Sequence, residues 1–117
     1  VKYAELTYNK EGEPSETIKG RVERAMAIQR DRLNKESIFC NAQMNKKLIK
    51  KYCPLEEGAK ELLGIAMTEL GFSARAYDKI LRVSRTISDL AKSELILAEH
   101  ISEAIQYRAK DNVPLIY

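Results

Sequence analysis

The chain of 117 residues contains no tryptophan, one histidine and two cysteines, and only 7% of its residues are aromatic. Two cysteines, Cys40 and Cys53, are too few for a disulfide framework in a domain of this size and indicate reduced thiols in a cytoplasmic protein. A structural zinc site needs more ligands at closer spacing. The lone His100 lacks a partner set for catalysis, so we expect an ordinary surface or locally hydrogen-bonded histidine.

Several longer signals are also missing. No apolar run approaches the roughly 20 residues of a membrane span, and no secretory signal peptide opens the chain. We therefore expect no membrane contact and a cytoplasmic location. The phosphate-binding pattern G-x-x-x-x-G-K-[ST] does not occur, and no apolar strand ends in paired acids that could hold magnesium. This chain alone should bind no cofactor and hydrolyse no nucleotide, and its start at Val1 suggests a piece of a longer protein.

What is present favours a helical domain. Apolar residues make up 44% of the chain, helix formers dominate, and β-branched runs are few. The fold class that this composition indicates is all-α, a small bundle of about four to five helices in one domain. The net charge of +3 and the pI near 8.9 permit contact with nucleic acid or nucleotide without demanding it.

Apolar residues at helical spacing divide the chain into segments. Residues 1–14 indicate a linker or the tail of a preceding core, and residues 111–117 a tail. Between them lies the helical domain, residues 15–110. Its expected helices are 15–35, 45–52, 54–70, 73–91 and 98–109.

Capping residues set these boundaries. Ser15, Asn45 and Ser73 are natural N-caps, Pro54 suits a helix start, and Gly71 closes a helix at its C′ position. Only a Gly-Phe step separates the third and fourth helices, so we expect them to pack side by side as an α-hairpin. Between residues 36 and 43, the apolar Ile38, Phe39 and Cys40 should tuck onto the core.

The helix that begins after Ser73 has a long apolar face and an unusual cation. Phe72 and Tyr77 sit where a hydrophobic staple would pack. Arg75 falls in the first turn, where the helix dipole prefers negative charge. Either Arg75 points into water, or an anion such as a phosphate meets it, held by the guanidinium fork and the unpaired N–H groups of the helix end.

Two helices have strongly charged faces, which can be solvated surfaces or binding surfaces. The lysines of the short second helix could neutralise nucleic-acid phosphates or could form a solvated face whose stems cover apolar surface. They are Lys46, Lys47, Lys50 and Lys51. The first helix has a mixed-charge face that is typical of a solvated surface, with Arg21, Arg24, Arg30 and Arg32 beside Glu23 and Asp31.

Several blocks of sequence resemble one known family. They are GEPS at 12–15, KYCPL at 51–55, LGFSARAYDKIL at 70–81, SRTISDLA at 84–91 and EHISEAIQYR at 99–108. Together they resemble the C-terminal domain of the magnesium-chelatase-like AAA+ ATPases of the ComM/YifB type. The resemblance covers about residues 12–108.

The resemblance implies an AAA+ lid-like bundle that follows a nucleotide-binding core. Its Ser-Ala-Arg segment resembles the sensor 2 motif, in which the arginine, here Arg75, reaches the ATP phosphates. Arg85 and Asp89 lie four residues apart and are expected to pair on the helix surface, with Arg85 in a structural or a nucleotide-related role. ATP and magnesium would be bound by the core of the parent protein.

The family also implies a parent that is a ring-forming homo-oligomer and a DNA-acting, competence-related ATPase, not an enzyme that inserts magnesium into porphyrin. We interpret the chain as the lid of such an ATPase. Two alternatives stay open. One is a nucleic-acid-binding module that uses the four lysines, and the other is a protein-interaction bundle with an exposed apolar patch.

Overall fold

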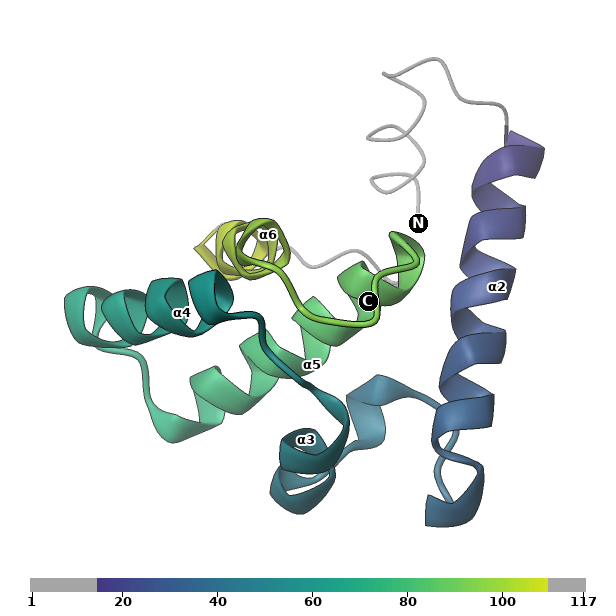
Figure 1. The fold of residues 1–117 in the computed structure, drawn as a ribbon, viewed down its shortest axis with the longest axis horizontal. Helices are drawn as coiled ribbons and strands as arrows, with labels where there is room; N and C mark the ends of the chain where they lie inside the picture. Colours follow the sequence, from purple (N-terminus) through teal and green to yellow (C-terminus); the bar gives the residue numbers. More distant parts are fainter. Residues whose placement is uncertain (1–14, 110–117) are drawn as a thin grey trace.

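The computed structural model describes residues 15–109. This part of the chain forms five α-helices and two short 3-10 turns, without a β-strand, so the all-α prediction is confirmed (Figure 1). The elements in order are α2 (Ser15–Arg32), η1 (Asn34–Glu36), η2 (Asn41–Gln43), α3 (Lys46–Tyr52), α4 (Glu57–Leu70), α5 (Ala74–Leu90) and α6 (Ala98–Ala109). The predicted terminal segments, 1–14 and 111–117, lie outside the described residues.

Helix α5 is the centre of the fold. It contacts α2, α3, η2 and α6, and its stretch from Val83 to Asp89 is buried at every position (Figure 1). A helix buried all round needs partners on every side, and the four neighbouring elements supply them. Thr86 in this stretch finds its hydrogen-bond partner inside the protein, in the amide of Asn41.

The predicted caps of α3, α4 and α5 are confirmed. The side chain of Asn45 accepts the N–H of Leu48 at 2.9 Å, and the hydroxyl of Ser73 accepts the N–H of Ala76 at 3.2 Å. Gly71 ends α4 with φ at 63°, a left-handed conformation that costs glycine little. These boundaries follow from local chemistry, because each cap satisfies backbone groups within one turn.

Pro54 does not start a helix, contrary to the sequence-based prediction. Helix α4 begins at Glu57, and the preceding segment is extended and pairs with the loop before α6. The N–H of Ile96 donates to the carbonyl of Pro54 at 2.9 Å, and the N–H of Glu56 donates to the carbonyl of Ile96 at 3.0 Å. In a helix that began at Pro54, the carbonyl of Pro54 would instead accept an N–H group one turn further along the same helix.

The expected α-hairpin of α4 and α5 is also wrong. Few residues of these two helices lie close together, whereas α6 packs against both of them (Figure 1). The buried face of α4, formed by Ala59, Leu63 and Ala66, packs on α6 because α5 is enclosed by other elements. Helix α6 therefore joins α4 to the rest of the core.

The connector between α2 and α3 is only partly as predicted. Ile38 packs against the core and Cys40 is half-buried, but Phe39 is 70% exposed. Two 3-10 turns order this segment, and Gln43 fixes its middle by accepting the N–H of Phe39 at 2.7 Å. That turn directs Asn41 into the interior and leaves Phe39 outside.

Candidate functional site

The first turn of α5 presents a cation to solvent. Arg75 is exposed, the turn contains no acidic residue, and within residues 15–109 no ion pair or hydrogen bond engages its guanidinium. Ser73 caps the N–H of Ala76, which leaves the N–H groups of Ala74 and Arg75 without an acceptor in the described part of the chain. This end of α5 therefore combines a positive helix terminus with an uncommitted guanidinium.

Phe72 and Tyr77 flank this turn, and both are half-buried against the hydrophobic core. Their packing fixes the direction in which α5 begins, although a direct staple contact between them stays a prediction. A helix start held by a cap and by two half-buried aromatic side chains gives Arg75 a defined position on the surface.

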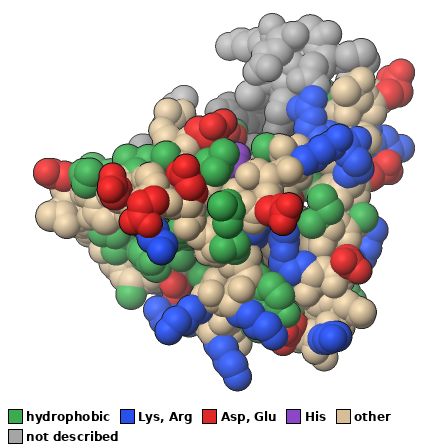
Figure 2. All heavy atoms as spheres, in the orientation of Figure 1, with side chains coloured by type: hydrophobic (Ala, Val, Ile, Leu, Met, Phe, Trp, Pro, Cys, Tyr) green, Lys and Arg blue, Asp and Glu red, His purple; other side chains and the backbone are tan. Residues whose placement is uncertain are grey.

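The lysines of α3 are all exposed, but two of them are already paired. The ammonium of Lys46 lies 3.3 Å from the carboxylate of Asp78, and that of Lys51 lies 3.2 Å from Glu36. Figure 2 shows Lys and Arg side chains gathered along the lower edge of the molecule, where α3 lies, and Asp and Glu side chains gathered over α4 and α6. The hydroxyl of Tyr52 also donates to Glu36 at 2.6 Å, and this hydrogen bond lowers the pKa of Glu36.

Arg85 lies in the interior, not on the helix surface. Its side chain is 3% exposed, and it donates to the carbonyls of Tyr52 at 3.3 Å, Ser93 at 2.8 Å and Glu94 at 3.0 Å. The predicted i, i+4 pair with Asp89 exists at 3.4 Å, but both side chains are buried and the Nε–H of Arg85 is not aligned for a hydrogen bond. Arg85 thus ties the end of α3 and the loop after α5 to the middle of α5.

Asp89 is the centre of a buried polar network that the sequence did not reveal. Its carboxylate accepts two hydrogen bonds from Arg32 of α2, at 2.5 and 2.9 Å, and one from the amide of Asn41 at 2.9 Å. Asn41 also donates to the hydroxyl of Thr86 at 3.0 Å, and its backbone N–H donates to Gln29 at 2.9 Å. Arg32, expected on a solvated face, is therefore half-buried and joins α2 to α5.

The sequence carries little signal of this network. At helical spacing Arg85 and Asp89 lie on the face opposite Ile87, a pattern that is typical of an exposed polar face. The burial of this face depends on Arg32 and Asn41, which supply hydrogen-bond partners from far along the chain.

The two cysteines are free thiols, and neither shows the features of a nucleophile. Cys53 is buried, and this burial raises the pKa of its thiol to about 11, so the thiolate is scarce at neutral pH. Cys40 is half-buried and donates weakly to Gln43. Residues 15–109 contain no group of three or more His, Cys, Asp or Glu side chains placed to hold a metal ion.

His100 is locally hydrogen-bonded, as one of the two expected alternatives has it, but it is buried and not on the surface. Its Nδ1 accepts the backbone N–H of Leu97 at 2.9 Å, and only 4% of the residue is exposed. Burial lowers the pKa of His100 below its ordinary value of 6.5, against the opposite influence of Glu99 and Glu103. The folded state therefore favours the neutral imidazole.

This depressed pKa predicts a loss of stability on mild acidification. Because the unfolded chain takes up the His100 proton first, the stabilisation is complete above about pH 6.5 and is lost as the pH falls towards the lower folded pKa. One proton gives a slope of at most about 1.4 kcal/mol per pH unit. Urea unfolding of the wild type and His100→Gln between about pH 7.5 and 5.5 measures it. Equal slopes in both proteins would contradict the prediction.

Comparisons with known proteins identify the family of this chain. The family model described as magnesium chelatase, subunit ChlI C-terminal, matches residues 12–108. The chain belongs to this family.

Three curated relatives agree with this assignment. The chain is 38% identical over 102 residues to the uncharacterized protein YifB of Escherichia coli K12, and 40% identical over 98 residues to the competence protein ComM of Haemophilus influenzae Rd. It is 37% identical to YifB of Salmonella typhimurium LT2 over 102 residues. These alignments cover 84–87% of this chain and 18–19% of the relatives, so the chain spans about a fifth of their length.

No solved structure matches the chain. No helix in the described part of this ChlI C-terminal family member is long and apolar enough to cross a membrane. The helical fold and the family assignment confirm two of the sequence-based predictions. The roles of Arg75, Arg85 and the α3 lysines stay predictions.

Proposed function

We propose that this chain is the C-terminal helical lid of a magnesium-chelatase-like AAA+ ATPase. In this proposal Arg75 contacts the phosphates of ATP that is bound in a separate core domain of the parent. In this proposal the core supplies the phosphate loop and the magnesium site, and the chain itself is not an enzyme. The parent acts in the cytoplasm as a homo-oligomer. A competence-related role on DNA is part of the same proposal, and the name of one relative, competence protein ComM, supports the link to competence.

The observation that carries this proposal is the exposed guanidinium of Arg75 in the first turn of α5, which has no ion pair or hydrogen bond within residues 15–109. A cation in this position is slightly unfavourable in an isolated helix, because it adds to the positive end of the dipole. The cost is offset when an anion binds there. A guanidinium holds phosphate oxygens through two parallel hydrogen bonds, and the free N–H groups of the turn add further donors.

The lid would act by charge stabilisation and by movement. ATP supplies the phosphates on which negative charge develops during hydrolysis, and a fixed guanidinium beside them lowers the energy of that charge. Arg75 stands at one end of α5, and the Asp89–Arg32 bonds lie near its other end, about 20 Å away along the helix. If a change of nucleotide state shifts Arg75 and α5, the Asp89–Arg32 bonds would move α2 together with α5.

A nucleic-acid-binding module is a weaker candidate. It would rely on four lysines, but Lys46 and Lys51 are paired with carboxylates in the described structure. Only Lys47 and Lys50 lack an ion pair there, and two lysines neutralise few phosphates. Salt-dependent binding of DNA by this chain, lost in Lys47→Ala and Lys50→Ala, would favour the module over the lid.

The test is the variant Arg75→Ala in the full parent protein. We expect ATP turnover to fall about tenfold or more, because one positioned donor to a developing negative charge is lost. Lys79→Ala is the matched control, because Lys79 is exposed on the same helix, one turn further along. Arg75→Lys should recover only part of the rate, since an ammonium lacks the bidentate fork. Unchanged turnover and ATP affinity in Arg75→Ala would overturn the proposal.

A further inference from the structure

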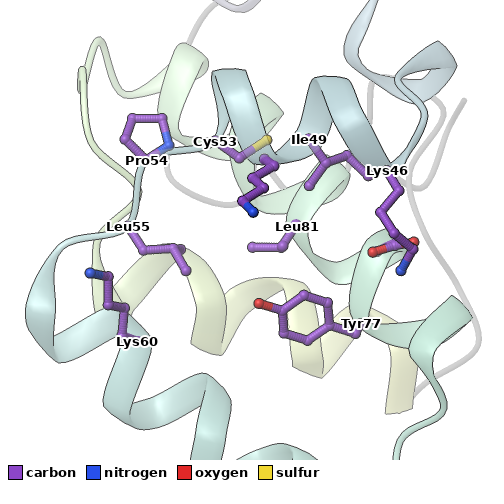
Figure 3. Close-up of a pocket in the computed structure, with 10 residues that line it drawn as sticks. Lys46, Ile49, Cys53, Pro54, Leu55, Lys60, Tyr77 and Leu81 are labelled. Atoms are coloured by element: carbon purple, nitrogen blue, oxygen red, sulfur yellow. The ribbon is translucent and has the colours of Figure 1, made fainter.

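A groove of about 640 Å³ lies between α3, the segment 53–55, α4 and the start of α5. This volume is within the range of ordinary ligand pockets. Its floor is apolar and is formed by Ile49, Leu55 and Leu81, with the ring of Tyr77 at one side (Figure 3). Cys53 also lines it, and burial keeps that thiol neutral. The proposed lid function, which rests on Arg75, does not use this groove.

The charges around the floor are mainly positive. Lys46 and Lys50 line the groove from α3, Lys60 lines it from α4, and Asp78 is the single acid among the lining residues. Asp78 is already paired with Lys46 at 3.3 Å. Figure 3 shows Lys46 and Lys60 on opposite sides of the groove with the apolar side chains between them. Lys50 and Lys60 therefore face one apolar floor from two walls, and neither has an ion pair within residues 15–109.

We propose that this groove binds a short acidic segment of a partner protein, with one or two large apolar side chains on the floor and carboxylates towards Lys50 and Lys60. The positive charges of the lysines favour an acidic ligand. The apolar floor favours a peptide, because apolar side chains that anchor in a pocket supply most of the binding energy at small interfaces. The proposal does not depend on Arg75 or on ATP.

A nucleic acid fits the groove less well. Lys60 stands between Glu57 and Glu61 on α4, and both acids are exposed, so a long polyanion that crosses this wall meets repulsion. Tyr77 is the single aromatic residue that lines the groove, whereas single-stranded nucleic acid needs a series of stacking faces. A short acidic segment can place its carboxylates at the two lysines and avoid the acids beside them.

The proposal is tested by selecting peptides from a random phage-displayed heptapeptide library on the 117-residue chain. We expect enriched sequences with Leu or Phe next to Asp or Glu. The best peptide, made with a fluorescent label, should then bind about tenfold more weakly to Lys50→Glu and to Lys60→Glu, since each change places like charges together. Lys47→Glu is the matched control on α3, because Lys47 does not line the groove.

Three outcomes would overturn the inference. The first is enrichment of basic peptides, or of no sequence at all. The second is a loss of peptide affinity in Lys47→Glu that equals the loss in Lys50→Glu and Lys60→Glu. The third is displacement of the peptide by single-stranded oligothymidylate that binds more tightly than the peptide. The second would indicate general charge attraction, and the third would assign the surface to nucleic acid. Circular dichroism of each variant confirms that the helices are intact before affinities are compared.

Discussion

Replacing Asp89 with alanine is expected to destabilise the domain by about 3–5 kcal/mol. The side chain of Asp89 is 1% exposed. Its carboxylate accepts hydrogen bonds from Arg32 and Asn41, and it forms an ion pair with Arg85. Removing it leaves two half-buried or buried guanidinium groups without their counter-charge and leaves the amide of Asn41 with one acceptor fewer. The cost is that of uncompensated buried charge, which exceeds the net value of the original bonds.

Asp78→Ala is the matched control for this prediction. Asp78 is also on α5 and also pairs with a cation, Lys46, at 3.3 Å, but the side chain of Lys46 is 73% exposed. An exposed pair of this kind contributes at most about 1 kcal/mol. Urea unfolding of both variants at neutral pH measures the difference in unfolding free energy. Similar losses in the two proteins would mean that burial of the Asp89 network adds nothing.

Asp89→Asn separates charge from shape. Asparagine keeps the size of the side chain and one acceptor oxygen, but it removes the negative charge between Arg32 and Arg85. If the charge dominates, this variant should lose nearly as much stability as Asp89→Ala. A small loss would assign the network to hydrogen bonding alone.

The sequence predicts those parts of the fold that depend on one or two turns of chain. Asn45, Gly71 and Ser73 each act on backbone groups within a few residues, and the structure has all three where the sequence places them. The last helix, 98–109, also matches its predicted range. Local chemistry decides these features, so neighbouring residues are sufficient to predict them.

The errors concern contacts between segments far apart. The position of Pro54 predicts a helix start, but its carbonyl accepts the N–H of Ile96, which lies beyond α4 and α5. The short turn at Gly71 predicts an α4–α5 hairpin, but the faces of α5 are filled by α2, α3, η2 and α6. A short connection sets where two helices begin and end, whereas the angle between them depends on all their neighbours.

In the candidate site, too, the sequence predicts what depends on neighbouring residues and does not predict contacts between distant segments. The exposed place of Arg75 at the start of α5 could be predicted, because it follows from the cap at Ser73 and from the apolar face of the helix. The partners of Asp89 could not, because Arg32 lies 57 residues away and Asn41 lies 48 residues away. An i, i+4 pair of opposite charges usually lies on a helix surface, and this pattern predicts an exposed Arg85. Here the three carbonyl acceptors make its burial possible.

Ile101→Ala is expected to destabilise the domain by about 2–5 kcal/mol, the range for truncating a fully buried aliphatic side chain. Ile101 is 0% exposed and lies on α6, the helix that packs against both α4 and α5. Ile65→Ala on α4 is the control, because Ile65 is 60% exposed and its truncation should change stability by about 0.5 kcal/mol or less. Urea unfolding of both variants measures these values.

The same variant shows which helices hold α4 in place. Since α4 packs against α6 and few of its residues lie close to α5, weaker packing of α6 should loosen α4 as well. Amide hydrogen exchange in α4 should then accelerate in Ile101→Ala together with exchange in α6, while Ile65→Ala leaves both slow. Unchanged protection of α4 in Ile101→Ala would mean that α4 is held by other contacts, as in the hairpin that the sequence suggested. Faster exchange in both helices would establish α6 as the element that joins α4 to the core around α5.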